Sequence, residues 1–400
     1  MARPLELFAS VLPKPLRDRY ESLRRDVAMV FGPGPSPLVA FTPRRTSART
    51  ELLAPRALSV VDVVRETPDA TSFVLTDPTG RAIDFVAGQF FTVLVDLDGI
   101  IHRRAYSLSS DPRDTRRVRI TVKRIARGRV SNHLNESLRT GDTLRVLGPS
   151  GHFTVEPQIA REHHYVLIGG GSGITPLVAL ARTVLHDEPK SRVTLLFGNR
   201  GLADVIFRDE IDTLAREHAT RFAVRHVLEA PPEGWTGTSG RLDREVTARE
   251  LETLVTSDDA CTFFVCGPEP MMNEVREALV ARGVTGDRIR EERFTNPAAR
   301  VESSASSRAQ RVTFRLSKRG STHDVIAAPG QTVLEAGLGA GLDLDFSCAM
   351  GGCGACRVKH VDGEIEMEEP NCLSASERAE GYVLACVGRA TSPCTVEIAR

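Results

Sequence analysis

Four cysteines in the last quarter of the chain have types and spacing that could hold a redox-active metal. Cys348, Cys353 and Cys356 form a C-x4-C-x2-C pattern, and Cys386 follows about thirty residues later. Three thiolates on one tight loop can wrap a metal cluster while a fourth arrives from a distant strand. Glycines between the cysteines let the loop backbone curl closely enough for its N–H groups to point at sulfur atoms.

This spacing predicts a plant-type [2Fe-2S] cluster. The alternatives are structural zinc, which usually shows a second C-x2-C-like pair, and buried free thiols. We expect no secretory signal, and no apolar run approaches the roughly 20 residues that span a bilayer. The eight cysteines are therefore expected in a reducing, cytoplasmic compartment. Cys261, Cys372 and Cys394 fit no ligand spacing and are expected to be packed thiols.

A second group of residues could bind a flavin. In the run from Arg103 to Ser109, Arg104 could pair with a phosphate, the Tyr106 ring could stack on the isoalloxazine, and the Ser107 hydroxyl could hydrogen-bond near the reactive ring nitrogen. A tyrosine in a strand is more often simply part of a core, so the motif alone leaves that alternative open. Gly128 and Ser131 open a predicted short helix, whose free N–H groups and dipole suit a phosphate. An ordinary serine cap is the alternative.

A third group could bind a dinucleotide. A predicted strand, Tyr165–Ile168, runs into a glycine-rich loop and then a helix, which brings the backbone close to a pyrophosphate. Arg200, with Arg208 behind it, follows the next strand and favours a 2′-phosphate, hence NADPH; a merely solvated arginine, with NADH as donor, is the alternative. Cys266 ends a later strand and could lie against the nicotinamide, or be a buried thiol. The residues of this group are Gly171, Gly173, Thr175, Pro176, Arg200, Cys266, Gly267 and Pro268.

The elements that must position these residues change character along the chain. Short alternating runs over 57–156 predict an antiparallel sandwich or barrel, and strands alternating with helices over 157–296 predict a parallel sheet with crossover helices. Residues 297–310 read as a flexible linker, and 311–400 hold six of the eight cysteines. The extension 1–56 is basic, with one amphipathic helix predicted over 16–30. The chain has 52 Lys and Arg residues and 52 Asp and Glu residues. Its net charge therefore gives no overall positive potential that would favour binding of nucleic acid.

These motifs, in this order, resemble the ferredoxin-NADP reductase superfamily. The likeness is greatest to bacterial reductase components with a C-terminal plant-type ferredoxin domain, such as those of phenylacetyl-CoA epoxidase and 3-ketosteroid hydroxylase. The resemblance covers about residues 57–400. It implies a Greek-key β-barrel that binds FAD, an α/β Rossmann-like NAD(P)-binding domain and an α+β β-grasp ferredoxin domain. It also implies that Glu292 and Phe294 belong to the segment that returns toward the flavin.

The resemblance implies electron transfer from NADPH through FAD and the cluster to a separate oxygenase, hydroxylase or desaturase. No Rieske or diiron ligand pattern is present in the chain, so such an acceptor is another protein. The alternatives are a self-contained reductase of a quinone or ferric chelate, and a redox-sensing binding protein. The extension departs from the family pattern. It could dock on a partner, rest on a membrane surface, or pack on the barrel. Five acidic residues could meet a basic partner or form a solvated face: Asp362, Glu364, Glu366, Glu368 and Glu369.

Overall fold

The computed structural model describes residues 54–255, 261–294, 308–317, 320–368, 371–373 and 375–398. The amphipathic helix predicted over 16–30 and all but the last three residues of the linker predicted over 297–310 lie outside these ranges. Glu369 of the acidic group also lies outside them. Within these ranges, no helix is long and apolar enough to cross a membrane.

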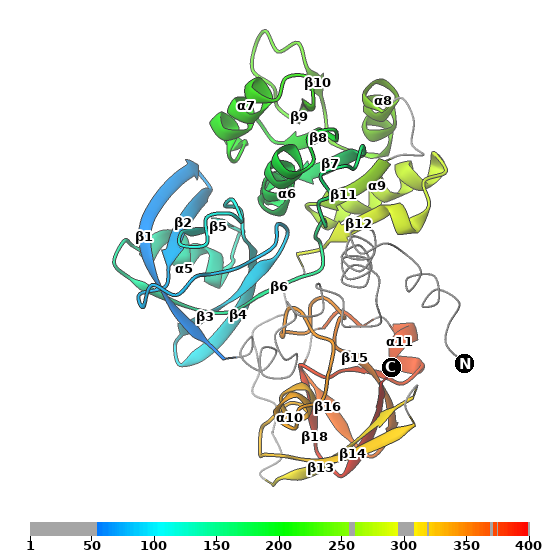
Figure 1. The fold of residues 1–400 in the computed structure, drawn as a ribbon. Coiled ribbons are helices and arrows are strands. Elements are labelled where there is room, and N and C mark those ends of the chain that lie inside the picture. The colour runs from blue at the N-terminus through cyan, green and yellow to red at the C-terminus, as the bar shows by residue number, and fades with distance from the viewer. Residues whose placement is uncertain are drawn as a thin grey trace, which may run out of the picture. The chain divides into compact units, whose positions relative to one another are not determined.

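Six antiparallel strands build the first sheet, in the order β4-β3-β6-β1-β2-β5 (Figure 1). A bridge between Leu108, just after β4, and Ile120 of β5 joins the two ends of the sheet, which confirms the predicted barrel. Helix α5 (Arg129–Ser137) packs on the barrel core through Val130 and Leu134. The strands are β1 (Arg56–Thr67), β2 (Ala70–Thr76), β3 (Phe90–Leu97), β4 (Ile100–Ser107), β5 (Val118–Lys123) and β6 (Thr143–Ser150).

Six parallel strands build the second sheet, in the order β10-β9-β8-β7-β11-β12. The strands are β7 (His164–Gly170), β8 (Arg192–Asn199), β9 (Phe222–Leu228), β10 (Thr238–Ser239), β11 (Cys261–Cys266) and β12 (Ile289–Glu292). The helices are α6 (Ile174–Asp187), α7 (Arg208–Glu217), α8 (Arg244–Leu254) and α9 (Glu269–Ala281), with short 3-10 turns η1 (Gly171–Gly173), η2 (Leu202–Asp204) and η3 (Gly286–Arg288).

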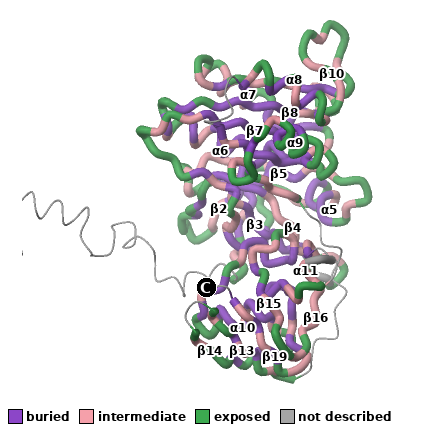
Figure 2. Tube along the Cα trace, turned by 90° about the vertical axis from the view of Figure 1, so that its right-hand side faces the viewer, coloured by how far each residue is buried: buried purple, intermediate pink, exposed green. Residues whose placement is uncertain are grey.

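The strand β7 is buried on both faces because helices cover both sides of the parallel sheet. Tyr165 and Leu167 share a core with α6 and α7, while Val166 and Ile168 share one with α8 and α9. Buried residues accordingly run along all of β7 and most of β8 (Figure 2). The chain winds one way from β7 to β10 and then returns to the other side of β7. The crevice between the carboxyl ends of β7 and β11 is therefore the topological switch point, where such sheets bind ligands.

The third sheet is mixed, in the order β14-β13-β19-β15-β17, with β13 and β19 parallel. Helix α10 begins with a capping box, in which Thr332 Oγ1 accepts the Glu335 N–H and Glu335 accepts the Thr332 N–H. The cysteine loop lies between α10 and β15. The elements are β13 (Gln310–Leu316), β14 (Ser321–Ala327), α10 (Val333–Gly339), β15 (Arg357–Asp362), β16 (Ile365–Met367), α11 (Ala375–Ala379), β17 (Tyr382–Leu384), β18 (Gly388–Ala390) and β19 (Cys394–Ile398).

Candidate functional site

One cavity of about 690 Å³ gathers motifs that are far apart in the sequence. Its wall combines β4, the segment from β5 to α5, the glycine loop after β7 and the loop after β11. The last two loops lie at the switch point of the parallel sheet. Ten of the predicted site residues line it: Arg104, Tyr106, Ser107, Gly128, Ser131, Gly171, Thr175, Gly267, Pro268 and Phe294.

Strand β4 supplies one wall of this cavity through alternate residues. His102, Arg104 and Tyr106 share a face because side chains alternate along a strand. Arg104 is half-buried, its Nη1 donates to the Arg103 carbonyl at 2.7 Å, and burial lowers its pKa. No carboxylate pairs with Arg104 in the part of the chain that the structure describes. A partly desolvated guanidinium facing a cavity suits a phosphate oxygen.

The start of α5 supplies a second anion-binding element. Its N-cap is Gly128, which has no side chain to cap the first turn, so N–H groups of that turn remain available. A Cβ at Gly128 would lie 2.6 Å from Ser131 Oγ, which accepts the Ile125 N–H at 3.2 Å. Gly128, Arg129 and Ser131 all line the cavity. The helix start therefore presents a positive dipole end and a cation to the same space as Arg104.

The glycine loop after β7 lies directly against the end of β11. A Cβ at Gly173 would lie 1.9 Å from the carbonyl oxygen of Cys266, so only glycine fits there. Thr175 Oγ1 donates to the Ser172 carbonyl at 2.9 Å, and Pro176 is buried in the first turn of α6. Gly173, Pro176 and Cys266 are absent from the cavity wall and support the loop from behind. Burial raises the pKa of the Cys266 thiol.

Lys123, at the end of β5, is a cavity residue that sequence reasoning missed. Its Nζ lies 3.1 Å from where a Gly171 Cβ would stand, and no carboxylate pairs with it among the described residues. Burial, and then the charge of Arg200, lower its pKa. A cation held over a glycine loop at the start of a helix favours a bound anion. No local motif marks this lysine, because its role depends on the loop that faces it.

Arg200 lies outside the cavity wall. Its guanidinium pairs with Asp69 at 2.6 Å and with Asp204 at 2.5 Å, and these bonds raise its pKa. The side chain is 58% exposed. A 2′-phosphate at this strand end would share Arg200 with two carboxylates, so the preference for NADPH stays a prediction.

A small second cavity, about 40 Å³, lies where the barrel meets the cysteine loop. Glu292 and Phe294 line it together with Ser107, Cys348 and Cys353. Burial, and then the charge of Cys353, raise the pKa of Glu292 to about 8. Ser107 and Phe294 line both cavities, so the segment after β12 connects the flavin motif to the cysteine loop.

The four cysteines predicted as cluster ligands form two close pairs. The thiols of Cys348 and Cys353 lie close enough to shift each other's pKa, and the Cys356 thiol raises the pKa of Cys386. The Gly352 N–H donates to Cys348 Sγ at 3.3 Å. No group of three or more His, Cys, Asp or Glu among the described residues is arranged to hold a single metal ion. Two thiol pairs, each pair suited to one iron, fit a [2Fe-2S] cluster held by four cysteines.

The cysteine loop contacts β3 and β4 on the side opposite the larger cavity. Thr92 Oγ1, on β3, donates to the Cys348 carbonyl at 2.8 Å, and an Arg103 Nη1 N–H donates to the Ala349 carbonyl at 3.0 Å. Phe90 and Cys348 share a buried apolar cluster. Arg103 and Arg104 are neighbours on opposite faces of β4. One strand therefore separates the larger cavity from the cysteine loop.

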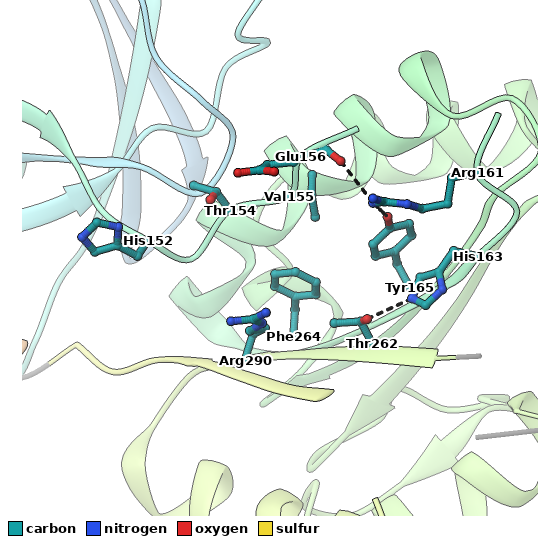
Figure 3. Close-up of a pocket in the computed structure, with 10 residues that line it drawn as sticks. All are labelled: His152, Thr154, Val155, Glu156, Arg161, His163, Tyr165, Thr262, Phe264 and Arg290. Carbon is teal, nitrogen blue, oxygen red and sulfur yellow. Dashed lines mark hydrogen bonds between the residues drawn. The ribbon is translucent and has the colours of Figure 1, made fainter. Parts of the chain in front are cut away.

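A third cavity, about 510 Å³, lies at the amino end of the parallel sheet (Figure 3). Arg161 donates to Tyr165 Oη at 3.0 Å and to the Glu156 carbonyl at 3.1 Å, and His163 bonds Thr262 at 2.9 Å. Tyr165 and Thr262 lie near the starts of β7 and β11, whereas the glycine loops follow the ends of these strands. None of the predicted site residues lines this cavity.

Comparison with known proteins matches each part of the chain. The oxidoreductase FAD-binding domain model matches residues 57–155, the oxidoreductase NAD-binding domain model 167–277, and the 2Fe-2S iron-sulfur cluster binding domain model 316–391. One of the subunits of 1,2-phenylacetyl-CoA epoxidase from Escherichia coli K12 is 34% identical over 336 residues, which cover 82% of this chain and 93% of that protein. The chain belongs to the family of reductases that combine FAD-binding, NAD-binding and 2Fe-2S domains.

One further relative agrees with this placement of the reductase, and one solved structure shares its fold. The ferredoxin reductase component of 3-ketosteroid-9-alpha-monooxygenase from Rhodococcus rhodochrous is 33% identical over 343 residues, covering 83% of this chain and 93% of that protein. The structure of phthalate dioxygenase reductase has a TM-score of 0.56 at 24% identity, covers 87% of this chain and 99% of its own, and shows the same fold. The reductase is thus an oxidoreductase with FAD-binding, NAD-binding and [2Fe-2S] domains, as the sequence predicted.

Proposed function

We propose that this reductase carries electrons from NADPH, through FAD and the [2Fe-2S] cluster, to a separate oxygenase, hydroxylase or desaturase. The observation that carries the proposal is the position of β4, with the large cavity on one face and the cysteine loop on the other. A flavin on the first face and a cluster on the second would be separated by a single strand.

The chain's own residues would bind and orient the groups. Arg104 and the start of α5 would hold the FAD phosphates, the Tyr106 ring would stack on the flavin, and Ser107 would hydrogen-bond near its reactive nitrogen. Bound FAD supplies hydride acceptance from the nicotinamide and release of single electrons. The residues that would hold the cluster are Cys348, Cys353, Cys356 and Cys386.

The dinucleotide would lie along the glycine loop at the switch point. Gly171, Thr175 and Lys123 would face its diphosphate, with Gly267 and Pro268 beside the nicotinamide. Gly173 and Pro176 would shape the loop, and Cys266 would lie beneath it. Glu292 and Phe294 would bridge the nicotinamide side and the cluster side, since they line the cavity that adjoins the cysteine loop. Arg200 would bind the 2′-phosphate of NADPH.

The names of the relatives support a protein as the electron acceptor, because one belongs to an epoxidase and another is a component of a monooxygenase. On the ferredoxin part, Asp362 and Glu364 are exposed and could meet a basic partner, whereas Glu368 pairs with Arg389. We propose functional units at 57–156, 157–296 and 311–400. The sheets support this division, because the strands of each sheet come from a single range. The first and third sheets begin one residue before their ranges, at Arg56 and Gln310.

An anaerobic titration of the purified protein with NADPH tests the proposal. Visible absorbance should show bleaching of a flavin, and low-temperature EPR should then show a rhombic [2Fe-2S] signal at sub-stoichiometric NADPH. Flavin reduction without a cluster signal would contradict the role assigned to the four cysteines. Rapid turnover of a quinone or ferric chelate without any added protein would favour the self-contained reductase instead.

A further inference from the structure

His102, on β4, is a buried polar side chain whose bonding is incomplete. It is 3% exposed, and neither ring nitrogen has a hydrogen-bond partner among the residues that the structure describes. A buried imidazole always carries at least one N–H that needs an acceptor. His102 is one of the residues that line the 690 Å³ cavity, so an acceptor could come from a ligand bound there.

The charges around His102 identify the kind of ligand. Arg104 on the same strand and Arg129 at the start of α5 both lie close enough to lower its pKa, after burial, while Asp96 and Asp98 act in the opposite direction. Asp98 already pairs with Arg129 at 2.6 Å. Two cations and an unsatisfied imidazole on one cavity wall favour an anion with several oxygen atoms.

The order of residues along β4 identifies the part of the flavin. Tyr106, Arg104 and His102 follow one another on one face, about 7 Å apart at each step. If Tyr106 stacks on the ring and Arg104 binds phosphate, His102 lies one further step away from the ring, on the side of the α5 start. An FAD molecule that runs along the strand would place its diphosphate between Arg104 and His102.

We propose that His102 donates a hydrogen bond to the diphosphate of bound FAD and so acts as a third anion ligand beside Arg104 and the start of α5. The inference rests on the flavin site proposed above. It adds a residue that no motif marks, and it predicts that His102 recognises the phosphates rather than the ring.

The test compares two flavins on the full-length protein after its flavin has been removed. FAD and riboflavin share the ring, but riboflavin has no phosphate. Their dissociation constants would be measured by fluorescence quenching for the unchanged chain, for His102→Phe, which keeps a ring without N–H groups, and for His102→Gln, which keeps a donor. His133→Leu, an exposed neighbour on α5, is the control.

His102→Phe should weaken FAD binding about tenfold or more and leave riboflavin binding within about twofold, since a hydrogen bond to a charged group is lost. His102→Gln should recover most of the affinity, and His133→Leu should behave like the unchanged chain. Unchanged FAD affinity in His102→Phe, an equal loss for FAD and riboflavin, or a loss in His102→Gln as large as in His102→Phe would each overturn the proposal. Failure of the unchanged chain to bind either flavin would instead overturn the flavin site itself.

Discussion

At the scale of single residues, Ser107 is the side chain that the proposed function places beside the reactive nitrogen of the flavin. It is buried and lines both the large cavity and the small one beside the cysteine loop. Ser107→Ala should slow flavin reduction by NADPH about tenfold, because one hydrogen bond near the reacting atoms is lost, while FAD stays bound. Anaerobic stopped-flow absorbance measures the rate. Ser137→Ala, exposed at the end of α5, is the control, and an unchanged rate in Ser107→Ala would contradict the assignment.

FAD binding should also depend on pH through His102. Burial and then Arg104 and Arg129 lower its pKa in the flavin-free protein, against the smaller effects of Asp96 and Asp98. A bound diphosphate would raise this pKa, so binding takes up a proton and should tighten as the pH falls from about 8 to 6. The FAD dissociation constant measured across this range should show the trend, and His102→Phe should not. A trend of equal size in both proteins would contradict the linkage.

Arg200 decides between the two nicotinamide dinucleotides if it reads the 2′-phosphate. Arg200→Ala should then lower kcat/KM for NADPH about tenfold and change the value for NADH little, because only NADPH loses a charge-assisted bond. Steady-state kinetics with both donors measures this ratio. Equal changes for both donors would mean that Arg200 acts only through its ion pairs with Asp69 and Asp204.

The sequence marked residues whose neighbours along the chain form a motif, and it missed residues whose role comes from across the fold. Arg104, Tyr106 and Ser107 could be named because they lie together in one run. His102 and Lys123 have no such local signal. They became visible only when the cavity brought β4, β5 and the glycine loop together.

At the scale of elements, the contact between the glycine loop and β11 is the most restrictive. Gly173→Ala would place a Cβ 1.9 Å from the Cys266 carbonyl oxygen, a backbone atom that cannot move without shifting β11. We expect the free energy of unfolding of the NAD-binding domain to fall by about 3 kcal/mol or more. We also expect NADPH to reduce the flavin no longer. Denaturant unfolding and stopped-flow kinetics measure the two effects. Gly286→Ala, with nothing within 4 Å of the new Cβ, is the matched control. Equal stability of the two variants would contradict the argument.

The two elements on either side of the glycine loop could be predicted, the strand from its apolar run and the helix because it follows a glycine loop. The strand predicted at Tyr165–Ile168 became β7, extended by a few residues, and the helix predicted after the glycine-rich loop became α6. The edge strand β12 was not singled out, since three of its four residues are charged. It is a strand because it pairs with β11, and that pairing is invisible in the local pattern.

At the scale of the whole molecule, the contact between the barrel and the cysteine loop should control electron transfer to the cluster. Arg103→Ala combined with Thr92→Val removes both bonds to the loop carbonyls. Flavin reduction by NADPH should be unchanged, while cluster reduction should slow about tenfold because the loop is held less firmly at the strand. Stopped-flow traces at flavin and cluster wavelengths separate the two steps. Arg113→Ala, on a surface turn paired with Asp111, is the control. Equal cluster reduction rates would contradict this role.

The hydrogen bonds that Thr92 and Arg103 donate to the cysteine loop end on main-chain carbonyls, those of Cys348 and Ala349. Every polypeptide has such carbonyls, whatever its side chains. A loop of the same length and curvature from another protein would therefore offer the same two acceptors to Thr92 and Arg103. Chimeras that join a ferredoxin domain from another protein to this barrel should keep the proposed electron transfer from the flavin to the cluster. The surface that meets the acceptor protein would then be that of the new domain. The choice of acceptor protein could then diverge without any redesign of the flavin side.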